Sequence, residues 1–111
     1  MANTHTSETE SPLFLKLDAV ANRYAELTKQ LTDPSVLNQP ALIHKLNKER
    51  TEIQELTELF YEFRVVLREL DETDQMLKDP GAEAELQKLA ADEARRLQVR
   101  RREIEDRKSV V

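Results

Sequence analysis

The longest regular pattern of apolar residues in the chain runs from Ala41 to Leu77. Apolar side chains recur there at alternating steps of three and four residues, which is the period of one face of an α-helix. The positions are Leu46, Ile53, Leu56, Phe60, Phe63, Leu67, Leu70 and Leu77, with the polar residues Glu49 and Asp74 completing the register. In the middle, Leu59 and Val66 widen the stripe, which indicates contact with two partners. The pattern predicts one long helix over about residues 40–77.

A second pattern of the same period precedes the first. Its apolar positions are Leu13, Leu17, Val20, Tyr24, Leu27 and Leu31. Ser11 can cap a helix here and Pro12 suits the first helical position, so we expect a helix over about 12–31. Asp33 and Pro34 end it, because the residue before a proline is pushed out of the α region. We expect a single extra turn through Leu37, followed by Asn38 or Gln39 as the cap of the long helix.

The third pattern is weaker. Asp79 is the expected cap and Pro80 the expected first residue of a helix over about 80–107. Its apolar positions are Leu86, Leu89, Ala90, Leu97 and Ile104, and Glu93 and Arg100 interrupt the seam. The half of this helix beyond Arg95 is therefore poorly specified, and we expect it to project into solvent or to dock elsewhere.

Together these patterns predict an all-α fold, an elongated antiparallel three-helix bundle with one long central helix and coiled-coil-like packing. The first and third helices would lie on the wide middle of the central one, within a single domain over 11–107. Residues 1–10 are expected to form a disordered arm and 108–111 a short tail.

Composition supports this interpretation. The chain is 39% apolar and 35% charged, with one glycine and no cysteine. This composition favours helices over strands and excludes disulfides and thiolate metal sites. Neither a signal peptide nor a run of about 18 apolar residues is present, so we expect a soluble protein of the cytoplasm.

Residues suited to catalysis or to metal binding do not cluster in the sequence. His5 falls in the expected arm and His44 at the start of the long helix, with no second histidine at ligand spacing. A single glycine excludes a phosphate-binding glycine loop, and the acidic pairs are those of a solvated helix face. We therefore expect no enzyme activity, no cofactor and no metal.

Two groups of residues are candidates for contact with a partner. The first is a run of arginines near the C-terminus, where the basic charge of an otherwise acidic chain gathers. Its members are Arg95, Arg96, Arg100, Arg101, Arg102 and Arg107. They could contact phosphate in ribosomal RNA, although cations near a helix C-terminus are favoured in any case. The second is the pair Tyr61 and Val65, on the face of the long helix opposite the apolar seam. This pair is either a small docking patch or two ordinary exposed side chains.

The order of several short segments resembles the N-terminal helical domain of bacterial class-one peptide chain release factors, of the first type, which reads UAG and UAA. The segments are the apolar run 17–31, Leu31-Thr32-Asp33-Pro34-Ser35-Val36, Leu46-Asn47-Lys48-Glu49-Arg50, Phe60-Tyr61-Glu62-Phe63 and Gln75-Met76-Leu77-Lys78-Asp79-Pro80. Two triplets, 38–40 and 48–50, are more similar to the sister factor that reads UGA and UAA. The resemblance covers about residues 13–106.

The resemblance implies a module that helps a termination factor associate with the ribosome near the stalk base of the large subunit and communicate with the recycling GTPase. The Gly-Gly-Gln motif of such factors and their codon-reading tripeptide are not in this sequence. We therefore expect that the chain alone does not terminate translation, and that it is a gene fragment, a frameshifted copy or an excised domain.

A different interpretation stays open at this point. The chain could be a free-standing coiled-coil protein that self-associates through the seam of the long helix, with no role in translation. We expect a monomer if the seam is filled within the chain, and a dimer if it is not.

Overall fold

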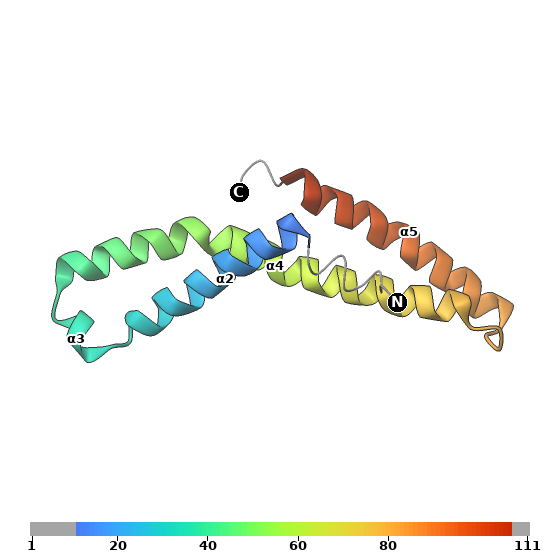
Figure 1. Ribbon diagram of the computed structural model, residues 1–111, viewed down its shortest axis with the longest axis horizontal. Helices are drawn as coiled ribbons and strands as arrows, with labels where there is room; N and C mark the ends of the chain where they lie inside the picture. The colour runs from blue at the N-terminus through green and yellow to red at the C-terminus, as the bar shows by residue number, and fades with distance from the viewer. Residues whose placement is uncertain (1–10, 108–111) are drawn as a thin grey trace.

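The computed structural model describes residues 11–107, and those residues form helices joined by short turns (Figure 1). The helices are α2 (Pro12–Gln30), α3 (Pro34–Leu37), α4 (Pro40–Lys78) and α5 (Ala84–Asp106). No strand occurs within 11–107, so the all-α prediction is confirmed. The predictions for His5, for the N-terminal arm and for the C-terminal tail fall outside the described residues.

The starts of α2 and α3 follow the caps expected from the sequence. The Ser11 side chain accepts a hydrogen bond from the backbone N–H of Phe14, and Pro12 opens the helix. Asp33 does the same for Ser35 at the start of α3. Gln39 is the cap residue of α4, but its side chain makes no capping bond. Short side-chain caps and proline thus fix where α2 and α3 begin.

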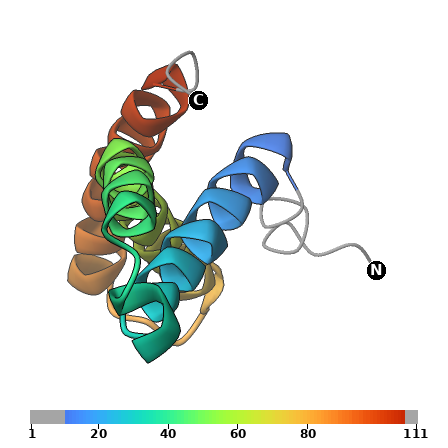
Figure 2. The same cartoon turned by 90° about the vertical axis from the view of Figure 1, so that its left-hand side faces the viewer.

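The three long helices make an elongated molecule with extents of 62 × 28 × 27 Å. Helix α2 runs antiparallel along the first part of α4, and α5 runs antiparallel along the second part (Figure 1). Seen from the end, α2 and α5 lie on different sides of α4 (Figure 2). The widened stripe of α4 therefore does meet two partners, as the sequence predicted.

All three long helices contribute to one core near the middle of α4. Its buried members are Leu17, Ala21, Leu59, Phe60, Phe63, Val66, Leu67, Leu70, Leu97 and Ile104. The ring of Phe14 packs edge-on against Phe60 at 5.2 Å between centroids, beside Phe63 at 6.4 Å. Only this central region is a three-helix bundle, because α2 and α5 each cover a different half of α4.

Polar contacts align α2 with α4 beyond the core. Arg23 forms two hydrogen bonds with the Glu49 carboxylate, at 2.5 and 2.9 Å. Arg50 donates to the Thr28 hydroxyl at 2.9 Å, and its guanidinium lies 4.6 Å from the Tyr24 ring centroid. Glu49, one of the two polar residues at heptad positions of α4, is therefore paired across the helix interface.

The predicted start of the third helix is wrong by one turn. The segment that begins at Pro80 is a turn, and α5 begins at Ala84 with Glu83 as its cap residue. The Asp79 carboxylate accepts the backbone N–H of Gly81 at 2.9 Å, which is a side-chain turn rather than a helix cap. The Gln87 side chain donates to the Asp79 carbonyl at 2.9 Å and holds this turn against α5.

The predicted end of this helix agrees with the structure, since α5 continues to Asp106. The expectation that its C-terminal half projects into solvent or docks elsewhere is wrong, because Ile104, with 0% of its surface exposed, lies in the core. The exposed positions of the apolar pattern lie instead near the connection between α4 and α5. Leu77, Leu86 and Leu89 are 38%, 48% and 64% exposed. The α4–α5 pair is therefore best packed near the middle of α4 and least packed beside its own connection.

Candidate partner-binding surfaces

Tyr61 and Val65 of α4 are partly exposed to solvent. They are 52% and 39% exposed, while Phe60 and Phe63 on the same turns are buried. The Tyr61 ring centroid lies 5.9 Å from that of Phe60, and the Arg64 guanidinium lies 5.7 Å from the Phe60 ring centroid. The arrangement presents an aromatic ring, a branched apolar side chain and a cation on a rigid helix, side chains that are frequent in binding surfaces.

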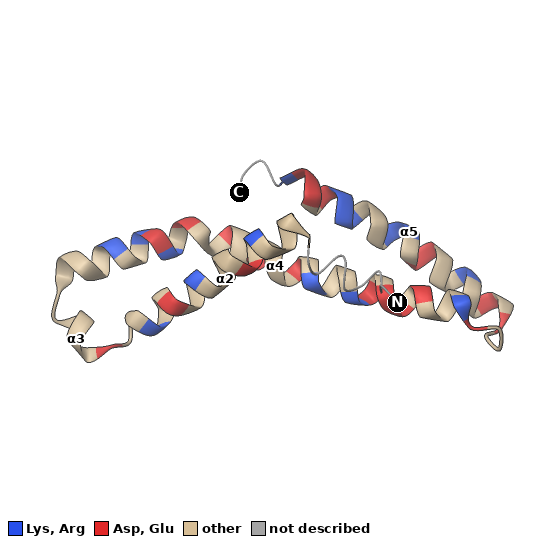
Figure 3. Ribbon diagram, viewed as in Figure 1, with Lys and Arg blue, Asp and Glu red and all other residues tan. Residues whose placement is uncertain are grey.

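The candidate arginines of α5 are mostly engaged within the molecule. Arg95 pairs with Asp92, Arg96 with Glu93, Arg100 with Glu62, Arg101 with Glu105 and Arg107 with Glu55. Within residues 11–107, Arg102 is exposed and makes no ion pair. The positive charge that the sequence gathers near the C-terminus is thus largely balanced by carboxylates of α4 and of α5 itself (Figure 3). This balance weakens the case for a phosphate-binding surface on α5.

Two of these pairs join α5 to α4. Arg100 hydrogen-bonds to both carboxylate oxygens of Glu62, with Nη2 at 2.5 Å from Oε1, and Arg107 pairs with Glu55. The hydrogen bonds from Arg100 hold the pKa of Glu62 below its usual range, and the same contact raises the pKa of Arg100. The sequence did not reveal these partners, since they depend on the register of two helices.

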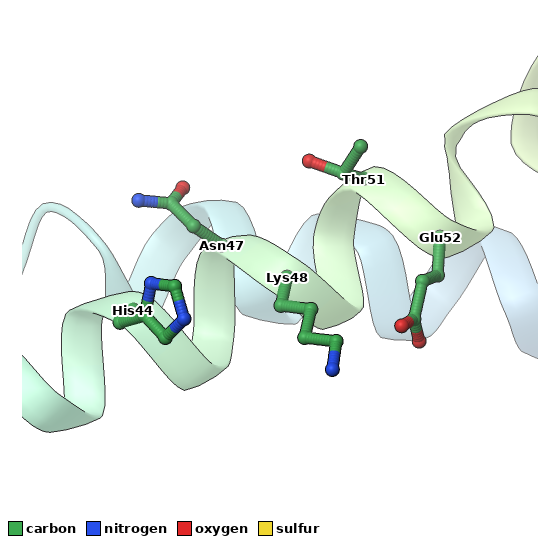
Figure 4. Close-up of a pocket in the computed structure, with 5 residues that line it drawn as sticks. All are labelled: His44, Asn47, Lys48, Thr51 and Glu52. Carbon is green, nitrogen blue, oxygen red and sulfur yellow. The ribbon is translucent and has the colours of Figure 1, made fainter.

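The His44 side chain borders a shallow surface hollow (Figure 4). The hollow is lined by His44, Asn47, Lys48, Thr51 and Glu52, all from successive turns of α4. Figure 4 shows Asn47 and Thr51 along one edge and Lys48 and Glu52 along the other, so the polar groups do not converge on a common point. A catalytic or metal site needs such convergence, and the hollow therefore has the features of a solvated helix face.

Two further properties of residues 11–107 bear on their chemistry. Among residues 11–107, no group of three or more histidine, aspartate or glutamate side chains is placed to hold a metal ion. No helix within the same residues has the length and apolar character needed to cross a membrane. The fold and its surfaces define an elongated helical domain whose distinctive features are patches on its exterior.

Comparison with known proteins identifies the family to which this helical domain belongs. The PCRF domain family matches residues 20–111, which is most of the chain, and the chain belongs to that family. No solved structure shows significant similarity to it.

Curated relatives carry the name peptide chain release factor 1. The protein from Bacillus cytotoxicus is 32% identical over 96 residues, covering 86% of this chain and 27% of the relative. The protein from Syntrophus aciditrophicus is 33% identical over 99 residues, and that from Listeria welshimeri is 33% identical over 95. The chain spans about 27% of the length of such relatives. The predicted resemblance to an N-terminal portion of the first type of release factor is confirmed.

Proposed function

We propose that this chain acts as the docking module of a translation termination factor and has no catalytic activity by itself. The observation that carries the proposal is the family match over residues 20–111, on a domain whose described residues include no group of three or more histidine, aspartate or glutamate side chains placed to hold a metal ion. The candidate partners are those that the family resemblance implies, the ribosome at the stalk base of the large subunit and the recycling GTPase. Such a module would act in the cytoplasm, where ribosomes work.

Within this proposal, we assign the ribosomal contact to the face of α4 that bears Tyr61 and Val65. An aromatic side chain on a rigid helix loses little conformational entropy on binding, so it is an efficient contact residue. Arg102 is the most available cation of the α5 cluster, and it is the residue through which that cluster would contact ribosomal RNA. The other candidate arginines would first have to give up carboxylate partners, which makes them poorer contacts.

Competition in a reconstituted peptide release assay tests the proposal. Ribosomes with a stop codon in the decoding site receive a limiting amount of full-length release factor 1, together with increasing amounts of this chain. We expect the chain to release no peptide alone and to slow release by the full-length factor, because both occupy the same docking site. Sedimentation of the chain with ribosomes through a sucrose cushion measures the association directly.

Matched variants locate the contact. Tyr61→Ser should weaken competition at least tenfold, and Arg102→Glu should weaken it mainly at low salt. Leu37→Ser is the control, since Leu37 is similarly exposed at 54% but lies on α3. Peptide release by the chain alone would contradict the non-catalytic assignment. If the chain neither competed with the full-length factor nor sedimented with ribosomes, docking itself would be contradicted.

A further inference from the structure

Four apolar side chains stand exposed where α4 and α5 join. Met76 and Leu77 end α4, and Leu86 and Leu89 lie in the first turns of α5; they are 44%, 38%, 48% and 64% exposed. We call these four residues the hairpin-tip patch. Leu77, Leu86 and Leu89 belong to the apolar patterns of their helices, so the sequence marks these three as core positions although the structure leaves them exposed. Met76 precedes Leu77 and adds a fourth exposed apolar side chain.

The register of the helix pair places the four residues together. Glu62 lies across from Arg100, and Glu55 lies across from Arg107. Carrying this antiparallel register toward the connection by about four helical turns brings Met76 opposite Leu86. Leu89 follows one turn further along α5. The patch is therefore a single surface that spans both helices.

Among the described residues 11–107, no third helix reaches the patch. Helix α2 begins at Pro12, beside the middle of α4, where Phe14 contacts Phe60. Toward the connection, the last buried apolar side chains are Leu70 on α4 and Ala90 on α5. Beyond these residues, two helices alone cannot bury all the apolar side chains that lie between them. The exposed leucines therefore still favour association with an apolar partner.

The charge around the patch indicates the chemistry of its partner. Residues 69–89 contain seven carboxylates and two lysines, which are Glu69, Asp71, Glu72, Asp74, Asp79, Glu83, Glu85, Lys78 and Lys88. Residues 11–68 contain equal numbers of acidic and basic side chains. Lys78 is itself paired with Asp74 at 2.9 Å. The hairpin tip therefore accounts for most of the net negative charge of the molecule, and red predominates there in Figure 3.

We propose that the hairpin-tip patch is a second docking surface, whose occupant is a cationic amphipathic segment of another protein. Apolar side chains of the segment would cover the four exposed residues, while its lysines and arginines face the surrounding carboxylates. A second copy of the chain fits poorly, because a symmetric contact would bring two acidic tips together. Nucleic acid and anionic membranes are repelled by the same charge. The inference does not rest on the assignment to translation termination.

Model peptides test both parts of the proposal. The probe is a fluorescein-labelled 18-residue peptide of leucine and lysine arranged with helical period. One comparison peptide has glutamate for lysine, and another keeps every lysine but has serine for leucine. Fluorescence anisotropy follows the binding of each peptide to the chain at about 50 and 300 mM NaCl. We expect the cationic amphipathic peptide to bind at least tenfold more tightly than either comparison peptide, and less tightly at the higher salt concentration.

Two double variants assign the binding site. Met76→Ser with Leu89→Ser should weaken binding of the cationic amphipathic peptide at least tenfold. Both side chains are largely exposed, so circular dichroism should show an unchanged fold. Leu15→Ser with Leu37→Ser is the matched control, because these two leucines are 56% and 54% exposed and lie on α2 and α3. Binding of the peptide to this control should stay within twofold of its binding to the unchanged chain. If the serine-containing peptide bound as tightly as the cationic amphipathic peptide, the proposed apolar contact would be wrong. If the cationic amphipathic peptide bound the Met76→Ser, Leu89→Ser variant as tightly as the unchanged chain, the proposed binding site would be wrong. A dimer in light scattering that is lost in the patch variant would assign the patch to a second copy instead.

Discussion

The guanidinium of Arg100 on α5 and the carboxylate of Glu62 on α4 form a two-point contact across the helix pair, with 2.5 Å between Nη2 and Oε1. The two side chains are 38% and 40% exposed, so solvent screens their attraction. Arg100 also approaches Glu103 at 3.7 Å. The contact therefore sets the register of α5 on α4 more than it adds to overall stability.

Replacing Glu62 by Gln should lower the free energy of unfolding by only about 0.2–1 kcal/mol, the usual range for an exposed ion pair. A double-mutant cycle with Arg100→Gln, followed by urea unfolding, measures the coupling between the two residues. Glu103→Gln is the control, because its contact with Arg100 is longer. A coupling well above this range would mean that the pair is more shielded than its exposure indicates.

The same contact predicts the direction of a pH dependence. The hydrogen bonds from Arg100 lower the pKa of Glu62 from its ordinary value of 4.5. The folded state therefore binds this proton less readily than the unfolded state, and the contribution to stability is complete above the ordinary pKa. It is lost as the pH falls through the lowered pKa. The stability difference between the unchanged chain and Glu62→Gln, measured by urea unfolding, should be present at pH 7 and shrink below about pH 4.5. A difference that grows with acid would contradict this sign.

Phe63→Ala should cost about 3–5 kcal/mol, because the side chain is 2% exposed and its removal leaves a cavity at the meeting point of three helices. Thermal unfolding followed by circular dichroism measures the effect. Tyr61→Ala is the matched control, an aromatic residue of the same helix that is half exposed, and its effect should be much smaller. A similar loss of stability in the two variants would mean that the core lies elsewhere on α4.

Gly81→Ala should leave the fold unchanged and raise stability by about 0.4–1 kcal/mol. Gly81 does not have a positive φ, and an added Cβ would meet the Asp79 side chain at an ordinary contact distance of 3.4 Å. The alanine restricts the unfolded chain more than the glycine does. Urea unfolding gives the sign, and a loss of stability would show that the turn depends on the freedom of glycine.

The chain should be a monomer at low micromolar concentration. Self-association through the seam of α4 would require displacement of α2 and α5, which fill that seam with Leu17, Leu97 and Ile104. Light scattering coupled to size exclusion measures the mass directly. A stable dimer that persists on dilution would favour the coiled-coil interpretation of the sequence.

The local features of the chain were predictable because they depend on neighbouring residues. The period of the apolar residues predicted the length of α4, and the prolines at 12, 34 and 40 indicated where three helices begin. The resemblance to release factors was readable from short segments in order. The turn at Asp79 was misread as a helix cap, since an aspartate before proline and glycine serves either role.

Long-range features were decided by how the helices pack. Ala21 and Thr57 are buried although neither belongs to the apolar pattern, and the Thr57 hydroxyl is satisfied by the Ile53 carbonyl at 2.9 Å. Partners of Arg100 and Arg107 follow from the register of α5 on α4, which no spacing within one helix reveals. Sequence by itself therefore determined the helices, their breaks apart from the start of α5, and the family. The helices and breaks follow from local sterics and periodicity, and the family from short segments in order. Only the tertiary structure decided which charges are neutralised and which leucines stay exposed, because that depends on how far α2 and α5 each extend along α4.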